Sequence, residues 1–259
     1  MQKLLGLPEL ASVHGHEVDK LIIYVHYLMG ALFVGWTIYF LYTIWRFRRS
    51  RNPKADYVGV TNNSSNYIEG AVVVVEAVLL LVFAVPLWAR AVDDFPPADK
   101  SVVVRVTGRQ FNWIARYPGA DGIFGKQDAR LATTENPMGI IARDAKRAAE
   151  DPAGKDDIVV EGTSEVVIPV HTNVIVHVSS LDVIHSFKVP ALRVTQDAIP
   201  GMSIPIYFEA TRTNTYQINC AQLCGNGHST MKGLLRIVPP ADFDAWVKSK
   251  AGAAPVSYE

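Results

Sequence analysis

Several side chains that bind soft metal ions lie close together near the C-terminal end of the chain. Cys220, Cys224, His228 and Met231 fall within twelve residues, and His185 lies upstream of them. Thiolate and thioether sulfur are soft ligands and imidazole is a borderline one, so this set favours copper over magnesium, calcium or manganese. The sequence therefore predicts a copper site built from one loop and one distant histidine.

The second cysteine distinguishes this pattern from a site for a single metal ion. A mononuclear electron-transfer copper site uses one cysteine, two histidines and a weak axial methionine. Cys220 adds a second thiolate four residues before Cys224, and two thiolates can bridge two copper ions. Such a pair spreads one unpaired electron over both metals, which suits fast electron transfer. A disulfide between the cysteines, a zinc site and a chance grouping of core residues are the alternatives.

Two apolar segments precede this part of the chain. Residues 21–45 carry no formal charge and would span roughly 37 Å as a helix, enough for a hydrocarbon core of about 30 Å. Residues 70–89 form a second apolar run that contains Glu76 and Pro86. A buried core helix is the alternative for each run. We expect a transmembrane hairpin with helices at about 21–46 and 68–91, and no cleavable signal before it.

The charge of the connecting segment orients the hairpin. Arg46, Arg48, Arg49, Arg51 and Lys54 follow the first apolar run, and positively charged loops stay in the cytoplasm. Both termini are therefore expected on the outer side of the membrane. We divide the chain into residues 1–95, which hold the N-terminal segment and the hairpin, and residues 96–259, an external domain.

Short β-type runs dominate the external domain. Val, Ile and Tyr are frequent in them, and Pro, Gly or Asn lie between them. The runs are residues 101–106, 165–170, 174–178, 204–209, 215–219 and 233–238. They predict an antiparallel sandwich or barrel, interrupted by an insertion at about 117–157 that contains a short helix around 142–150. Residues 240–250 are expected to form a closing helix.

The overall composition narrows the class of protein. Hydrophobic residues make up 49% of the chain and charged residues 19%, which favours a membrane component. The formal net charge is zero, so no general basic field is present to bind nucleic acid. The sequence also contains no Cys-x-x-Cys-His segment, which argues against a fused haem c.

One motif resembles subunit II of haem-copper cytochrome c oxidase, namely Cys220-x-x-x-Cys224-x-x-x-His228-x-x-Met231 preceded by Asp182-Val-Ile-His185-Ser. The resemblance covers nearly the whole chain. It implies a membrane-anchored all-β protein, in which a two-helix transmembrane hairpin precedes a cupredoxin-like Greek-key β-sandwich or barrel with a short C-terminal helix. It also implies two copper ions, a CuA centre, held by His185, Cys220, Cys224, His228, Met231 and the main-chain carbonyl of Gln222.

The same resemblance implies the electron-entry subunit of a terminal haem-copper oxidase. Such a subunit accepts electrons from a c-type cytochrome or similar donor and passes them to haem in subunit I, where oxygen is reduced to water with coupled proton movement. This chain would carry electron transfer and not the oxygen chemistry. The implied partners are subunit I, other oxidase subunits, the donor and the membrane. The implied location is a bacterial-type inner (cell) membrane, with the copper domain on the periplasmic side.

Three positions depart from the pattern of this family. Gln222 stands where the family usually has a glutamate that reaches a magnesium ion shared with subunit I, and a neutral amide binds a hard cation more weakly. We therefore expect weak or absent magnesium. Phe111 stands in place of a tryptophan that accepts electrons, so Trp113, Phe111 and Asp182 are the candidates for electron entry. Another aromatic such as Tyr117, or a donor that docks differently, is the alternative, and core packing is the alternative for Trp113. Leu181 replaces a second acid beside Asp182, which predicts a less acidic docking surface.

A membrane carboxylate matches the family as well. Glu69 lies 17 residues before Pro86, the spacing at which the family places a glutamate at the cytoplasmic mouth of a proton channel. The alternative is an ordinary acid at a helix start, where the helix dipole favours it. Glu76 has no such counterpart, and we expect it to face a partner helix.

Two other functions compete with electron entry. A copper-free subunit of a quinol oxidase would share the helices and the β domain but would lack the metal ligands, which are all present here. A copper-storage or delivery protein would have more exposed methionines or a reactive cysteine pair. Metal content, near-infrared absorption and a multi-line EPR spectrum separate these functions.

Overall fold

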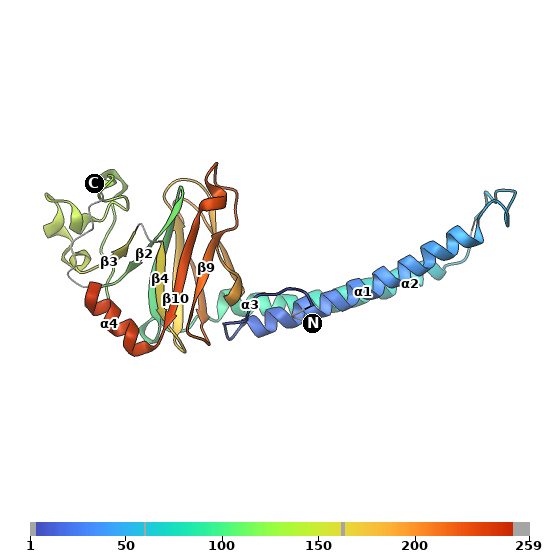
Figure 1. The fold of residues 1–259 in the computed structure, drawn as a ribbon, viewed down its shortest axis with the longest axis horizontal. Helices are drawn as coiled ribbons and strands as arrows, with labels where there is room; N and C mark the ends of the chain where they lie inside the picture. Colours follow the sequence, from blue (N-terminus) through green and yellow to red (C-terminus); the bar gives the residue numbers. More distant parts are fainter. Residues whose placement is uncertain (1–3, 60, 162–163, 251–259) are drawn as a thin grey trace. The chain divides into compact units, whose positions relative to one another are not determined.

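The computed structural model describes residues 4–59, 61–161 and 164–250 of the 259-residue chain (Figure 1). Internal contacts divide them into two compact units. One unit comprises His16–Asp93 with the described residues up to Leu7, and the other comprises Pro8–Gly15 with the described residues from Asp94 onward.

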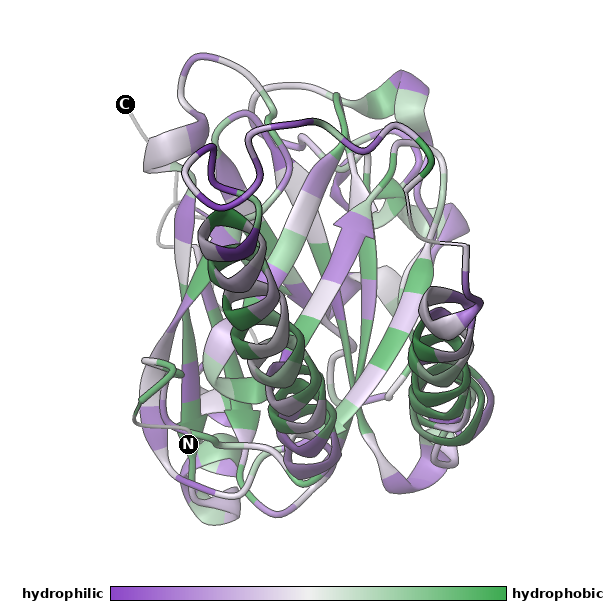
Figure 2. Ribbon diagram, turned by 90° about the vertical axis from the view of Figure 1, so that its right-hand side faces the viewer, coloured by the Kyte–Doolittle hydropathy of each residue, from purple (hydrophilic) through white to green (hydrophobic). Residues whose placement is uncertain are grey.

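The first unit consists of apolar helices. One passage is α1 (Gly15–Arg46), and the other is formed by α2 (Ser64–Val78), a π-helical turn η1 (Leu79–Ala84) and α3 (Val85–Asp93). Both passages are long and apolar enough to cross a membrane, and neither of their most apolar windows is buried within the chain. Hydrophobic residues follow both helices along their length (Figure 2). Exposed apolar helices are what a membrane-spanning hairpin requires, whereas a core helix would be covered.

The π-helical turn has a local cause in the sequence. Pro86 follows it by two residues, and proline lacks the backbone N–H while its ring crowds the carbonyl of the preceding turn. The helix accommodates Pro86 by widening over Leu79–Ala84, so the second passage continues to Asp93 without a break.

The second unit is built on two five-stranded sheets, with strand orders β3-β2-β1-β5-β8 and β4-β10-β9-β6-β7. The first sheet contains β1 (Val102–Arg109), β2 (Asn112–Tyr117), β3 (Ile158–Val160), β5 (Asn173–Ser180) and β8 (Ile204–Glu209). The second contains β4 (Glu165–Pro169), β6 (His185–Val189), β7 (Val194–Ala198), β9 (Asn214–Cys220) and β10 (Lys232–Val238).

The six expected strands are all present, which confirms the predicted β domain. The prediction of a wholly antiparallel arrangement is wrong, because β1 pairs in parallel with β5 and β10 pairs in parallel with β4. Alternating Val and Ile side chains fill the core, and Val104, Val106, Val174 and Val176 are completely buried. The four strands that the sequence did not indicate are β2, β3, β6 and β7.

The segment between β2 and β3 is folded without a long helix. It contains four short 3-10 turns, η3 (Ala129–Leu131), η4 (Ile141–Arg143), η5 (Ala148–Glu150) and η6 (Pro152–Lys155). The helix predicted around 142–150 is therefore wrong. The Asp144 carboxylate accepts hydrogen bonds from the N–H groups of Lys146 and Arg147, and this side-chain bonding replaces the continuing helical ladder.

A buried ion pair anchors the end of that segment. Arg116 on β2 and Asp157 both have completely buried side chains and are hydrogen-bonded to each other. The guanidinium also donates to the carbonyl of Gly125. The insertion is thereby attached to β2, the strand next to the edge of the first sheet.

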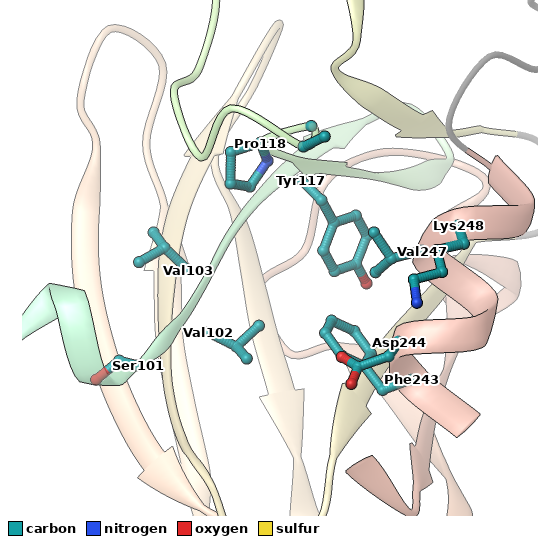
Figure 3. Close-up of a pocket in the computed structure, with 11 residues that line it drawn as sticks. Ser101, Val102, Val103, Tyr117, Pro118, Phe243, Asp244, Val247 and Lys248 are labelled. Carbon is teal, nitrogen blue, oxygen red and sulfur yellow. The ribbon is translucent and has the colours of Figure 1, made fainter. Parts of the chain in front are cut away.

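The expected C-terminal helix is present as α4 (Pro240–Lys250). Phe243 and Trp246 pack against Tyr117, with ring centroids 6.3 and 5.0 Å from that of Tyr117. A cavity of about 430 Å³ opens between α4 and β2, beside Tyr117 and Phe243 (Figure 3). The helix therefore covers the edge of the sandwich at the point where the insertion leaves it.

The short segment Pro8–Gly15 also belongs to the β unit, which the sequence did not indicate. Ser12 forms a β-bridge with Ala210, and the N–H of Ala11 donates to the carbonyl of Ala191 at 2.9 Å. Ala11 is completely buried. The segment thus contributes to the core of a unit whose remaining residues follow the membrane helices in the sequence.

Candidate metal centre

Two neighbouring strands of the second sheet position the first two predicted ligands. β6 begins at His185 and β9 ends at Cys220. The strands are antiparallel, with Phe187 opposite Cys220, and the N–H of Ala221 donates to the carbonyl of Ser186 at 3.0 Å. This register places His185 and Cys220 at the same edge of the sheet.

The loop from Cys220 to Met231 returns the chain to β10 and presents the remaining ligands. The N–H of Cys220 donates to the carbonyl of Met231, so the two ends of the loop are joined. Gly225 has a φ angle of +134°, a backbone conformation that residues other than glycine rarely adopt. A 3-10 turn, η8 (His228–Thr230), precedes Met231. The loop is therefore a closed turn that directs Cys224, His228 and Met231 inward.

The side chains predicted to bind metal converge on Cys224. Its Sγ lies 3.7 Å from Sγ of Cys220, 3.6 Å from Nδ1 of His228 and 3.7 Å from Sδ of Met231. Cys224 and Met231 are buried. The four ligands that fall within twelve residues of the sequence thus form one compact group of nitrogen and sulfur atoms.

The other cysteine has its own imidazole and carbonyl neighbours. Sγ of Cys220 lies 3.9 Å from Nδ1 of His185 and 3.1 Å from the main-chain oxygen of Gln222. The ligand atoms of His185, Cys220 and Cys224 all lie within 4.8 Å of one another. The structure therefore brings together all six groups that the sequence and the family resemblance suggested.

Both cysteines are free thiols, so the disulfide alternative does not describe this structure. Burial, together with the adjacent Cys220 thiol, raises the pKa of Cys224 to about 11. A neutral thiol pair in an apolar setting is a poor nucleophile, and a metal ion must displace the thiol protons when it binds.

His185 is oriented by a carboxylate on the far side of its ring. Nε2 of His185 lies 2.8 Å from Oδ1 of Asp182, which leaves Nδ1 directed at the thiols. Partial burial raises the pKa of Asp182, but hydrogen bonds from the N–H of Gln110 and from His185 outweigh it, so the pKa lies below its ordinary value. An ionised carboxylate behind a ligating histidine fixes the ring orientation and increases its basicity.

Gln110 is a site residue that sequence reasoning missed. Its backbone N–H donates to Oδ2 of Asp182 at 2.7 Å, and its side-chain Nε2 donates to the carbonyl of Cys224 at 2.6 Å. It lies in the turn between β1 and β2, more than 100 residues before Cys224. Since these bonds form only in the folded chain, no local spacing could reveal them.

Two glycines permit the close packing of this site. A Cβ on Gly227 would overlap the ring of Phe111, and a Cβ on Gly108 would lie 2.8 Å from the His185 ring. Both positions therefore require the absence of a side chain. The β1–β2 turn is held directly against the Cys220–Met231 loop.

The candidates for electron entry occupy different environments. Trp113 is completely buried, and its ring centroid lies 6.1 Å from that of His185. Phe111 is partly exposed and lies over the loop glycines. A donor protein can touch Phe111 and not Trp113, while Trp113 contacts a ligand ring. Electron entry through these residues or Asp182 stays a prediction.

The donor set fits copper better than zinc. Two thiols, two imidazoles, one thioether and one carbonyl meet at one place. Structural zinc sites use cysteine, histidine and carboxylate and leave thioethers unused, whereas the soft thioether suits copper. Met231 is therefore the residue that decides between the two metals.

Glu69 lies elsewhere, on the exposed surface of α2. It lines a hollow of about 630 Å³ together with Trp36 and Tyr39 of α1. Its part in proton uptake remains a prediction.

Comparison with known proteins extends this description. Residues 102–238 match the family model "Cytochrome C oxidase subunit II, periplasmic domain". The chain is 30% identical to the alternative cytochrome c oxidase subunit 2 of Bradyrhizobium diazoefficiens, over 93% of this chain and 82% of that protein. It is 29% identical to cytochrome c oxidase subunit 2 of Cereibacter sphaeroides, over 95% of this chain and 80% of that protein. The crystal structure of the periplasmic domain of subunit II of cytochrome oxidase from Bradyrhizobium japonicum aligns with a TM-score of 0.41 and 29% identity, over 60% of this chain and 95% of that one.

Proposed function

Because the chain belongs to the cytochrome c oxidase subunit II family, we propose that its Cys–His–Met cluster holds the dinuclear copper centre at which electrons enter the oxidase. The protein is a subunit of a haem-copper oxidase, an oxidoreductase complex of respiratory electron transport. Its two apolar helices and its periplasmic-type domain make it a membrane-anchored protein. Subunit I is the partner that receives the electrons.

The observation that carries the proposal is the symmetric placement of the two thiols. Each cysteine sulfur has its own imidazole, His185 at 3.9 Å from Cys220 and His228 at 3.6 Å from Cys224. The sulfurs lie 3.7 Å apart. This pairing supports a site in which both cysteines, both histidines, Met231 and the carbonyl of Gln222 would hold two copper ions.

The surrounding residues hold the ligands of such a centre rigidly and shield part of it from water. When bound, the copper pair supplies a one-electron redox step. His185 is fixed by Asp182, and Cys224 is fixed through its carbonyl by Gln110. Met231 and His185 are buried, which excludes water from these two ligands. Ligands that cannot move between redox states keep the reorganisation small.

We propose that both termini and the β unit face the periplasm of a bacterial-type cell membrane. The support is the positively charged segment that follows α1, which carries Arg48, Arg49, Arg51 and Lys54. Arg51 also stacks on Trp45, with the guanidinium carbon 3.9 Å from the ring centroid, as expected for side chains at a membrane interface.

We propose that magnesium binds weakly beside this centre. The main-chain oxygen of Gln222 faces Cys220, so its side chain is the group left to reach a second metal. That side chain is an amide in place of the carboxylate usual in the family. Elemental analysis of the purified oxidase that finds full magnesium occupancy would contradict this proposal.

Proton uptake at Glu69 is the corresponding proposal for the membrane unit. Its support is the exposed position of the carboxylate on α2, at the end of the hairpin near the basic segment. Glu69→Gln is expected to slow oxidase turnover while the copper EPR spectrum stays unchanged. A turnover rate equal to that of the parent would contradict it.

The experiment for the copper centre uses the purified oxidase and matched pairs of variants. We expect two copper ions per chain beyond those of subunit I, a near-infrared band and a multi-line EPR spectrum. Met231→Leu and His185→Asn are expected to alter or abolish that spectrum. Their controls, Met202→Leu and His177→Asn, remove the same groups outside the cluster. One copper per chain, or identical spectra in all variants, would contradict the dinuclear assignment.

A steady-state assay separates the electron-entry function from a quinol oxidase subunit. The parent complex is expected to oxidise a reduced c-type cytochrome and to lose that activity in Met231→Leu while quinol remains a poor substrate. Rapid quinol oxidation at the same rate in the parent and in the ligand variants would instead favour a quinol oxidase subunit.

A further inference from the structure

Two arginines lie side by side on the face of the first sheet that the insertion covers. Arg105 on β1 is the register partner of Arg116 on β2, and register partners point to the same face of a sheet. Ile114, two residues before Arg116, packs with Met138 of the insertion, which identifies this face. Like charges placed opposite each other on neighbouring strands destabilise a sheet. The pair of arginines therefore requires negative charge nearby.

Phe124 of the insertion lies against both guanidinium groups. Its ring centroid is 4.2 Å from the guanidinium carbon of Arg105 and 5.7 Å from that of Arg116. The carbonyl of the next residue, Gly125, accepts a hydrogen bond from Nη2 of Arg116 at 2.7 Å. The two charges thus lie between the sheet and the insertion, where water screens them less than at an open surface.

A third arginine reaches the same place from the η4 turn. Gly154 packs between Gly125 and Ala142, since a Cβ on Gly154 would lie 3.1 Å from Cα of Gly125 and 2.9 Å from Cβ of Ala142. Arg143 follows Ala142 and is partly buried. Burial, and then repulsion from Arg116, lower the pKa of Arg143. Arg143 therefore adds to the positive charge around Arg116.

The acidic side chains of this region already have partners. Two of them form ion pairs with arginines, and two accept hydrogen bonds from main-chain N–H groups. The ion pairs are Asp157–Arg116 and Glu161–Arg109, and the N–H groups are those of Lys126, which donates to Asp151, and Asp121, which donates to Asp156. Within the part of the chain that the structure describes, neither Arg105 nor Arg143 forms an ion pair.

These two arginines cannot relieve the repulsion by losing their charge. Burial and repulsion from Arg116 lower the pKa of Arg105 as well, and the attraction of Asp157 does not offset them. A guanidinium nevertheless stays protonated at physiological pH. A partly buried charge without a partner is costly. An anion from outside the chain would remove that cost for Arg105 and Arg143 together.

The buried ion pair also has two unpaired atoms. Nη1 of Arg116 and Oδ1 of Asp157 are buried, and neither forms a hydrogen bond with any described residue. Folded proteins pair nearly all such groups, with the chain itself, with water or with a ligand. One of the two atoms is a donor and the other is an acceptor. Hydrogen phosphate matches both, because it has charged oxygens for a guanidinium and a hydroxyl group for a carboxylate.

We infer that Arg105, Arg143 and Nη1 of Arg116 bind an inorganic phosphate ion between the first sheet and the insertion. The guanidinium groups donate charge-assisted hydrogen bonds to the phosphate oxygens, and Oδ1 of Asp157 accepts from the phosphate hydroxyl. Arg105 and Arg143 are only partly buried, so the ion reaches the site from solvent. The site is separate from the copper ligands and joins β1, β2 and η4.

Two related anions lack the proton that Asp157 selects. Sulfate has no hydroxyl group at neutral pH, and an ionised phosphodiester, such as a lipid headgroup, has none on its phosphorus. A site that hydrogen-bonds a ligand hydroxyl strongly rejects analogues without it, because its own polar group is then left unpaired. Both anions are therefore expected to bind at least about tenfold more weakly than phosphate.

Equilibrium dialysis of the purified oxidase against radiolabelled inorganic phosphate tests the site. Unlabelled phosphate is expected to displace the label, and sulfate and dimethyl phosphate to displace it poorly. Arg105→Gln and Arg143→Gln are each expected to weaken phosphate binding about tenfold, because each removes a charge-assisted contact. Arg130→Gln, which changes an exposed arginine of the same insertion, is the matched control and should leave binding unchanged.

The copper EPR spectrum provides an independent check that each variant is folded. A parent complex with its normal copper spectrum that retains no phosphate would overturn the site. Equal phosphate affinity in all three arginine variants would overturn the assignment of its ligands. Displacement by sulfate as effective as that by phosphate would refute the selection by Asp157. Equally effective displacement by dimethyl phosphate would overturn inorganic phosphate as the ligand in favour of a lipid headgroup.

Discussion

Gln110 donates a hydrogen bond from its side-chain Nε2 to the main-chain oxygen of Cys224, 2.6 Å away. The bond joins the β1–β2 turn to the loop that carries five of the six predicted ligands. A backbone carbonyl held from outside the loop fixes the position of the cysteine without occupying its sulfur. This relationship makes Gln110 a positioning residue for the metal centre.

Replacement of Gln110 by alanine is expected to loosen the ligand loop. Loss of one such hydrogen bond destabilises a protein by about 1 kcal/mol, and we expect copper to be lost to a competing chelator several times faster. Gln127→Ala is the matched control, because Gln127 donates a similar bond, 3.0 Å long, to the carbonyl of Met138 inside the insertion. Equal copper retention in the two variants would refute the positioning role.

Asp182→Asn is expected to disturb the orientation of His185. The carboxylate accepts from the Gln110 N–H on one oxygen and from His185 on the other, and an amide offers only one acceptor oxygen. One of the two bonds must therefore be lost. We expect copper affinity to fall by about 10- to 100-fold and the EPR hyperfine pattern to change. Asp197→Asn, on the exposed side of β7, should leave both measurements unchanged.

Gly227→Ala is expected to displace the ligand loop, because the new methyl group would overlap the Phe111 ring. Phe111→Ala opens that space. In a double-mutant cycle on copper retention, the combined variant should recover part of what Gly227→Ala loses, with a coupling of about 1–2 kcal/mol. Strict additivity of the two substitutions would show that the loop does not rest on Phe111.

Asp157→Ala is expected to destabilise the β unit strongly. The substitution leaves the Arg116 guanidinium buried without its carboxylate, and breaking a buried ion pair in this way costs about 3–5 kcal/mol in the free energy of unfolding. Denaturant titration followed by tryptophan fluorescence measures the change. Arg130→Ala removes an exposed partner of Asp128 and should have little effect. The copper EPR spectrum is expected to be the same in both variants.

Much of the fold could be predicted because its strands bury one face. In the run of residues 174–178, Val174, Val176 and Val178 lie two positions apart and are completely buried, as the period of a strand predicts. The missed strands carry other signals. β6 begins with a ligand, His185, and β7 reads Val-Thr-Gln-Asp-Ala, with polar residues in its centre. Their pairing is set by neighbouring strands, which no local window contains.

The metal ligands could be predicted from the sequence, whereas the residues that hold those ligands in place could not. Cys220 to Met231 lie in one loop, so their spacing alone indicates a shared target. Gln110 reaches that loop only through tertiary structure. Phe111 and Trp113 have the same parity and would share a face in a regular strand. The turn before β2 breaks the alternation, so Phe111 lies at the surface and Trp113 in the core.

The β unit also depends on the order in which the chain is made. Ser12 pairs with Ala210, and Ala11 fills a core position. Ala11 and Ser12 are nevertheless synthesised before the membrane helices, and Ala210 is synthesised after them. At about 5–20 residues per second, the strand position that Ser12 needs emerges on the order of 10–40 s later. A soluble version that starts after α3 would leave the place of Ala11 empty. Completion of the β unit thus spans the synthesis of both membrane helices, because Pro8–Gly15 is made before the helices and the strands that it pairs with are made after them.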